Sequence, residues 1–174
     1  MPLKRRLQHN FSYLKAFPAF LVFVGMALIA GESMADKPLN NFLWSNRPVL
    51  IFGSPNDQNG ESLWKTQLDM IADHRDGVLE RDIVVLDIAP GSVSVILGDN
   101  DFLKPSLAFS AELYEFYDVN ENDFAVILVG KDGTEKDRWS APVKMTEIFE
   151  RIDSMPMRQR EMHQKEMSQS GPKD

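Results

Sequence analysis

The 174-residue sequence contains no cysteine, which removes several classes of function at once. A chain without cysteine forms no disulfide, no zinc–thiolate site, no iron–sulfur cluster and no cysteine nucleophile. Basic residues are also few, since 19 Lys and Arg stand against 26 Asp and Glu, for a formal net charge of −7. Because nucleic-acid binding requires a basic footprint, this charge argues against a nucleic-acid partner. With 43% apolar residues, the composition is that of a globular protein.

The N-terminal segment has the three-part order of a secretory signal peptide. Four basic residues precede or flank the start of an uncharged apolar run at Ala16–Ala30, and Ser33-Met34-Ala35 then places small residues at a cleavage site before Asp36. The apolar run is shorter than the roughly 20 residues that a membrane-spanning helix needs. We therefore expect cleavage between Ala35 and Asp36 and a periplasmic or extracellular protein. Membrane association through an uncleaved leader is the alternative.

Three short apolar runs predict buried strands, at Arg47–Phe52, Asp82–Ile88 and Phe124–Val129. The third run is apolar on both faces, as a central strand must be. Gly130–Gly133 is typical of a hairpin turn, and Thr134–Trp139 would be the return strand.

Apolar residues recur at helical spacing in three other stretches: Trp64, Leu68, Ile71 and Ala72; Phe109, Leu113, Phe116 and Tyr117; Met145, Ile148, Phe149 and Ile152. Ser106 or Ser110 is expected to cap the second helix, and Pro142 to lie in the first turn of the third. Pro156 would interrupt that helix, and the chain is expected to fray after Met162. The stretch 89–104 is ambiguous.

The predicted order is β-α-β-α-β-β-α, the arrangement of a thioredoxin-like α/β fold with a mixed central sheet and helices on both faces. Helical crossovers separate the first three strands, so these strands are expected to pair in parallel, with the hairpin adding an antiparallel edge strand. We predict a signal peptide at 1–35, an N-terminal extension at 36–46, a thioredoxin-like domain at 47–155, and a polar, methionine-containing tail at 156–174.

Three stretches resemble one branch of that fold: Glu80–Val85, Val129–Arg138 and Ile152–Met162. They are similar to the DUDES-type domain, a peroxiredoxin-related, thioredoxin-like family of unknown function that occurs in bacterial secreted proteins and in animal extracellular-matrix proteins. The resemblance runs from about Leu39 to Met162. It implies the fold and an extracytoplasmic location, and it implies no activity or substrate.

The loop after the first strand carries the nucleophilic cysteine in redox-active thioredoxin-like proteins. Here that loop offers only polar and small residues, among them Ser54, Asn56, Asp57 and Asn59. No thiolate is present to attack a disulfide or a peroxide, so no thiol redox activity is expected. The loop is interpreted as a vestigial active site, either a solvated turn or a repurposed ligand pocket.

Charged residues inside the family-like stretches form the candidate ligand or partner surface: Arg81, Lys131, Asp132, Lys136, Arg138 and Arg158. The alternative is a set of solvated ion pairs with neighbouring acids, which contribute little to stability. A basic patch in an otherwise acidic protein would bind an anion or a partner.

The methionines offer a second hypothesis, because Met155, Met157, Met162 and Met167 lie with His163 in a short C-terminal stretch. Thioethers are soft ligands suited to Cu(I). Packing of Met155 and Met157 against the domain is the favoured interpretation, because methionine fills irregular gaps.

Other metal and catalytic patterns fail. Asp118–Asn122 begins like a calcium-binding EF-hand loop, but Asp123 stands where Gly is needed and Val129 where Glu is needed. His74 is expected to stabilise a helix C-terminus. We therefore predict no metal and no cofactor. The favoured function is an exported, cysteine-free module that binds an unknown extracytoplasmic protein or small ligand. A cysteine-independent enzyme of peroxiredoxin-like descent is the alternative.

Overall fold

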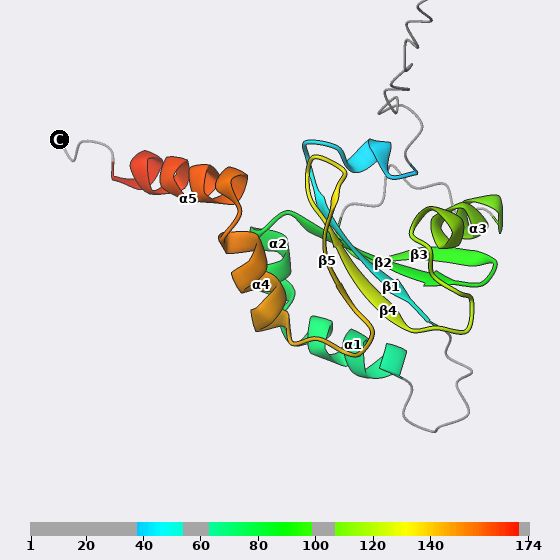
Figure 1. Ribbon diagram of the computed structural model, residues 1–174. Coiled ribbons are helices and arrows are strands. Elements are labelled where there is room, and N and C mark those ends of the chain that lie inside the picture. Colours follow the sequence, from blue (N-terminus) through cyan, green and yellow to red (C-terminus); the bar gives the residue numbers. More distant parts are fainter. Residues whose placement is uncertain (1–37, 54–62, 99–106, 171–174) are drawn as a thin grey trace, which may run out of the picture. The chain divides into compact units, whose positions relative to one another are not determined.

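One five-stranded mixed sheet forms the centre of the fold, with strand order β3-β2-β1-β4-β5 (Figure 1). The structure is a computed structural model, and it describes residues 38–53, 63–98 and 107–170. The strands are β1 (Arg47–Phe52), β2 (Ile83–Ala89), β3 (Ser92–Leu97), β4 (Ala125–Val129) and β5 (Glu135–Trp139). All residues of β1 and β4 are buried, which confirms the buried strand predicted at Arg47–Phe52 and the central strand predicted at Phe124–Val129.

The predicted pairing is right for β1 and β2, which are parallel, and wrong for β4, which is antiparallel to β1. The reason is β3, which lies in the ambiguous stretch and turns back on β2 through Gly91, at φ 81°. This extra reversal makes the strand that follows the next helix run opposite to β1. Together with the antiparallel β4–β5 hairpin, the topology is that of a thioredoxin-like α/β fold.

Helices cover both faces of the sheet, as predicted. They are α1 (Leu63–Ala72), α2 (Arg75–Glu80), α3 (Leu107–Phe116), α4 (Met145–Asp153) and α5 (Pro156–Gln169), with a 3-10 turn η2 (Asn40–Phe42) before β1. Leu113 and Tyr114 of α3 pack with Phe52 in one core. Ile71 of α1 and Ile148 of α4 pack in the other core, on the opposite face.

Two details of α3 differ from the prediction. The helix begins before Ser110, whose hydroxyl donates a hydrogen bond to the Ala89 carbonyl oxygen (2.7 Å) and so does not cap the helix. Ser106, the other expected cap, lies outside the described residues. Tyr114 is buried where Phe116 was expected, and Phe116 is 47% exposed.

Helices α1 and α4 also differ from the prediction, α1 in the residues that it buries and α4 in the residue at which it begins. Ala72 is exposed, and Gln67, a polar residue, is fully buried instead. The Gln67 amide exchanges hydrogen bonds with the Val143 backbone (2.8 and 3.2 Å), which satisfies both of its polar atoms. Helix α4 begins only at Met145, so Pro142 precedes its first turn.

The segment expected to be a frayed tail is the helix α5. Pro156 ends α4, as predicted, and it also stands in the first turn of α5, where its missing N–H costs no hydrogen bond. Most of the following residues are good helix formers. In the described part of the chain, no helix combines the length and apolarity that a membrane span requires. The predicted signal peptide and its cleavage site at Ala35–Asp36 lie outside the described residues.

Candidate functional site

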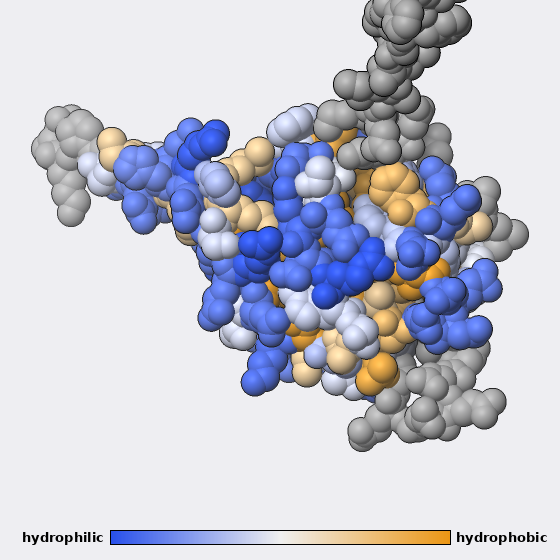
Figure 2. All heavy atoms as spheres, in the orientation of Figure 1, coloured by the Kyte–Doolittle hydropathy of each residue, from blue (hydrophilic) through white to orange (hydrophobic). Residues whose placement is uncertain are grey.

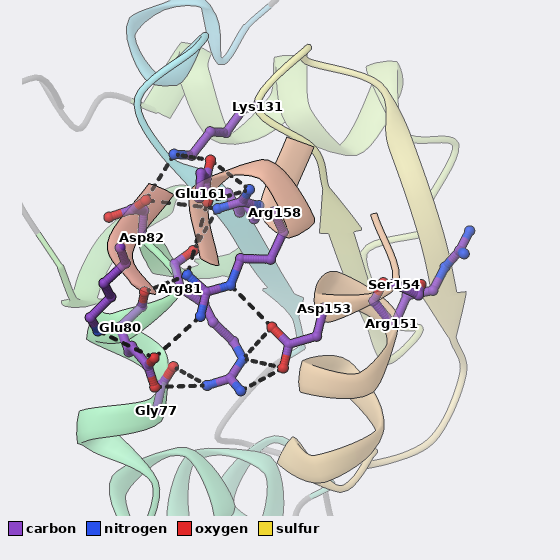
Figure 3. A network of polar contacts seen from close by, with 12 residues as sticks. Gly77, Glu80, Arg81, Asp82, Lys131, Arg151, Asp153, Ser154, Arg158 and Glu161 are labelled. Atoms are coloured by element: carbon purple, nitrogen blue, oxygen red, sulfur yellow. Dashed lines mark hydrogen bonds and ion pairs between the residues drawn. The ribbon is translucent and has the colours of Figure 1, made fainter. Parts of the chain in front are cut away.

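Three of the six candidate surface residues, Arg81, Lys131 and Arg158, meet in one network of charged side chains (Figure 3). Four carboxylates complete it, from Glu80, Asp82, Asp153 and Glu161. The elements are far apart in sequence, because the network joins the α2–β2 connection, the β4–β5 hairpin and the α4–α5 junction.

Arg47, which the sequence analysis did not single out, lies at the centre of this network. It begins β1 and its side chain is only 1% exposed. Its Nη2 donates to both carboxylate oxygens of Glu161 at 3.0 Å, and its Nη1 donates to the Arg81 carbonyl oxygen at 2.9 Å. The Nζ of Lys131 lies 2.9 Å from Glu161 and 2.8 Å from Asp82. The signal in the sequence that could have identified Arg47 is that a charged residue begins an otherwise apolar strand.

The Arg81 and Arg158 guanidiniums share the carboxylate of Asp153. Arg81 Nη2 lies 2.6 Å from it and Arg158 Nε 3.1 Å, while the Arg81 guanidinium stacks 4.3 Å above the ring of Phe149. Burial raises the pKa of Asp153, but hydrogen bonds and charge from the two arginines outweigh burial and hold that pKa below its usual value. Both arginines are engaged within the fold, so their contacts connect α2 to α4 and α5.

Glu161 is held in the same way. Burial raises the pKa of its carboxyl, and the hydrogen bonds from Lys131 and Arg47 outweigh this effect, so the pKa lies below its usual value.

Asp132 and Lys136 lie on the hairpin itself. The Asp132 carboxylate accepts hydrogen bonds from the Thr134 backbone N–H (3.1 Å) and hydroxyl (2.8 Å), and from Lys136 Nζ (2.6 Å). Burial raises the pKa of Asp132, but these three donors, together with the Lys136 charge, lower it further than burial raises it. Gly133, at φ 71°, closes the turn, as the sequence predicted.

Arg138 lies apart from the other five candidates. It pairs with Glu135 at 2.8 Å and donates to the Tyr117 carbonyl oxygen at 2.7 Å. The hydrogen bond to Glu135 raises the pKa of its guanidinium, and burial opposes this effect. Arg138 lines a separate pocket of about 360 Å³ with Asp118 and Asp123. The predicted vestigial loop, with Ser54, Asn56, Asp57 and Asn59, lies outside the described residues.

A second pocket, of about 450 Å³, opens between the β4–β5 hairpin and the α4–α5 junction. Five cationic residues line it: Arg47, Lys131, Lys136, Arg151 and Arg160. Asp132 is the one acidic residue of its lining, and we call this site the basic pocket. Figure 2 shows hydrophilic residues gathered over β5 and the α4–α5 junction, on the face that holds the hairpin.

The cations of the basic pocket differ in how firmly they are held. Lys136 pairs with Asp132, and Arg151 Nε lies 3.4 Å from Asp137, with all four side chains between 26% and 46% exposed. Ion pairs this exposed are weak and exchange partners easily. Within the described residues, Arg160 has no carboxylate in ion-pair range. Lys136, Arg151 and Arg160 therefore keep cationic capacity, while Arg47 and Lys131 are paired with Glu161, which does not line the pocket.

Two residues of the methionine hypothesis, Met155 and Met157, also line the basic pocket. Met155 is half-buried against the core, which agrees with the predicted packing role. Neighbouring cations repel a metal cation, so this setting disfavours Cu(I) binding, which stays the untested alternative. Among the described residues, no three His, Asp or Glu side chains are grouped to hold a metal ion. His74 Nδ1 lies 2.8 Å from the Met70 carbonyl oxygen at the end of α1, in agreement with the capping role.

Comparison with known proteins finds sequence similarity over most of the described chain. A family model described as "Domain of unknown function (DUF4174)" matches residues 38–161. The human Sushi repeat-containing protein SRPX is 30% identical over 148 residues, which cover 83% of this chain and 31% of that protein. Coiled-coil domain-containing protein 80 of Danio rerio is 28% identical over 146 residues, covering 73% of this chain and 16% of that protein. The chain thus spans about a third or less of these relatives. The narrower DUDES-type assignment stays a prediction.

Among solved structures, thioredoxin peroxidase I of Plasmodium yoelii matches with a TM-score of 0.48 and 17% identity, over 70% of this chain and 79% of that one. The mitochondrial 2-Cys peroxiredoxin of Plasmodium falciparum matches with a TM-score of 0.48 and 15% identity, over 77% and 86% of the two chains.

Proposed function

This chain belongs to the DUF4174 family, and from that premise we propose that it is an exported binding module that recognises an anionic group in the basic pocket. The family's description carries no activity. The proposal therefore rests on the site itself, and the relatives' other regions have no bearing on it.

The observation that carries the proposal is the reversal of charge at this one place. The whole chain has a formal net charge of −7, yet five cationic residues and one acidic residue line the basic pocket. A concave surface lined by one sign of charge concentrates counter-ions. The pocket, at about 450 Å³, falls within the size range of small-ligand sites.

Glu161 supports a carboxylate or a similar oxyanion as the recognised group. Its carboxylate already lies within hydrogen-bond distance of two cations that line the pocket, Arg47 and Lys131. Lys136 and Arg151 can meet further anionic groups, because their present ion pairs are exposed and weak. Arg160 can do so because, among the described residues, it has no carboxylate in ion-pair range.

Binding is favoured over catalysis at this site. Ser154 is the one hydroxyl-bearing residue of the pocket lining, and its Oγ donates a hydrogen bond to the Arg151 carbonyl oxygen at 2.7 Å. A nucleophilic serine needs a base positioned to take its proton, and a carbonyl oxygen is not such a base. With no cysteine in the chain, thiol chemistry is also removed.

Calorimetric titration of the purified protein with phosphate, citrate and a short polyglutamate peptide tests the proposal. At least one of these anions should bind, and the double variant Lys136→Gln/Arg160→Gln should bind it at least tenfold more weakly, because losing even one hydrogen bond to a charged group costs about 1.5–3 kcal/mol.

Lys65→Gln, which removes one cation from α1 outside the pocket, is the matched control and should bind as the wild type does. If no anion of the panel binds, or if the control loses as much affinity as the double variant, the proposal is wrong.

A further inference from the structure

We propose that Met155 and Met157 form an oxidation site at which anionic oxidants convert thioethers to sulfoxides, because the basic pocket concentrates such oxidants beside them. The proposal depends on the charge of the pocket and not on its having a natural ligand. It also assigns a role to the methionine-rich stretch, which the proposed binding function does not use.

The two residues flank Pro156 at the start of α5, and both line the basic pocket. Each is half-buried, so each can be reached from solvent. Other methionines provide internal comparisons. Met145 is 1% exposed, and Met167, in the last turns of α5, is 63% exposed and does not line the pocket.

Exposure and local charge make opposite predictions about which methionine reacts first. If solvent access alone decides, Met167 is oxidised before Met155 and Met157. The charge of the pocket reverses this order, but only for a negatively charged oxidant. A cleft lined by cations raises the local concentration of anions. The positive N-terminal end of the α5 macrodipole also favours an anionic oxidant at this position.

The chemistry requires no cysteine and no metal. A sulfur lone pair of the thioether attacks the terminal peroxide oxygen of a peroxy anion such as peroxymonosulfate, HSO5−, so an S–O bond forms and the O–O bond breaks. The methionine sulfur loses two electrons and the oxidant gains them, leaving as sulfate, while the hydroxyl proton of the oxidant passes to solvent. The product is the sulfoxide, which a separate reductase can return to methionine.

Oxidation would also change the fold locally. Met155 packs against the core that contains Ile148 and Ile152 of α4. A sulfoxide is polar, so its burial there opposes packing at the α4–α5 junction. We therefore expect the oxidised protein to melt at a lower temperature than the reduced protein.

Peptide mapping by mass spectrometry after brief treatment with limiting oxidant tests the site. Peroxymonosulfate serves as the anionic oxidant and hydrogen peroxide as the neutral one. The ratio of oxidation at Met155 and Met157 to oxidation at Met167 should be about tenfold higher with the anion, at the low end of the enrichment that charged clefts produce. High salt should remove that difference by screening.

Two variants separate pocket charge from simple access. Lys136→Gln/Arg160→Gln should lower the ratio measured with peroxymonosulfate and leave the ratio measured with hydrogen peroxide unchanged. Lys65→Gln, away from the pocket, should change neither ratio.

Equal ratios with the two oxidants in the wild-type protein would overturn the inference, as would a ratio unaffected by the double variant. Because no ligand is added, the proposed binding function can fail while this result stands, and the reverse also holds.

Discussion

Glu161 on α5 and Arg47 at the start of β1 form an ion pair across 114 residues of sequence, with Arg47 Nη2 at 3.0 Å from both carboxylate oxygens. The Arg47 side chain is 1% exposed and that of Glu161 26%. A buried guanidinium needs a partner, because an unpaired charge is costly in the protein interior. This pair therefore fixes the polar helix α5 to the sheet.

Replacing Glu161 by Gln should destabilise the protein, because the buried Arg47 loses its carboxylate partner while the side-chain volume is kept. We expect a loss of about 2 kcal/mol, less than the 3–5 kcal/mol of a fully buried pair, since Glu161 is partly exposed. Urea unfolding followed by circular dichroism measures the change. The control Glu166→Gln, at an exposed position of the same helix, should stay within about 0.5 kcal/mol of the wild type. Equal effects of the two substitutions would contradict the role assigned to Glu161.

Acid should loosen the attachment of α5. The folded-state pKa values of Asp153 and Glu161 lie below their usual values of 3.8 and 4.5. The stability that these carboxylates contribute is therefore complete above those usual values and is lost as the pH falls through the lowered ones. We expect the melting temperature of the wild type to drop below about pH 4.5 more steeply than that of Asp153→Asn/Glu161→Gln. If the melting temperatures of the two proteins fall equally with pH, these two carboxylates do not cause the loss of stability in acid.

Asp87 should behave in the opposite way. Burial raises the pKa of its carboxyl, and the hydrogen bond from Trp64 Nε1, at 2.6 Å, offsets only part of that rise. The stability linked to this group is thus complete below pH 3.8 and is lost as the pH rises through the raised folded-state value. Asp87→Asn keeps an oxygen acceptor for Trp64 and removes the charge.

We therefore expect the Asp87→Asn protein to melt at a higher temperature than the wild type at pH 7, with little difference near pH 3. Asp69→Asn, at an exposed position of α1, serves as the control. Tryptophan fluorescence checks that the contact to Trp64 survives. An Asn variant that is less stable than the wild type at neutral pH would be evidence against a charge penalty at Asp87.

The apolar runs of β1, β2 and β4 could be predicted because each is buried on both faces and leaves a continuous signal in the sequence. Strand β3 could not, since its serines alternate with Val93 and Val95 on a half-exposed edge. The direction of β4 depends on that missed strand, because one additional reversal inverts every later strand. The predicted topology is therefore wrong because it missed β3, the strand with the weakest local signal in the sequence.

The site shows the same limit. Arg81, Lys131 and Arg158 could be singled out because they lie in family-like stretches. Their arrangement around Arg47 and Glu161 could not, because the pairing spans 114 residues and no local spacing encodes it. Arg138 lies in the same family-like stretch as Lys131, yet its guanidinium donates to the Tyr117 carbonyl oxygen, away from the network.

Export stays a prediction from the N-terminal segment alone. If residues 1–35 are a signal peptide, the protein recovered from the periplasm or medium of expressing cells should begin at Asp36 by N-terminal sequencing. Replacing Ala35 by a bulky residue should slow processing, because the −1 position accepts small side chains. Recovery of the full-length chain from the cytosol alone would contradict the prediction.

The purified protein should show no sustained thiol-type turnover. Thiol–disulfide exchange requires a thiolate that forms a mixed disulfide, and peroxide reduction of the peroxiredoxin type requires a thiolate that becomes a sulfenic acid. The chain has no cysteine, and a serine hydroxyl does not cycle through these oxidation states. Methionine oxidation consumes oxidant once for each sulfur unless a reductase is present. We therefore expect no insulin reduction with dithiothreitol as donor, and peroxide loss that stops near one equivalent for each reactive methionine. Continued turnover in a metal-free preparation would show that another group carries a redox activity.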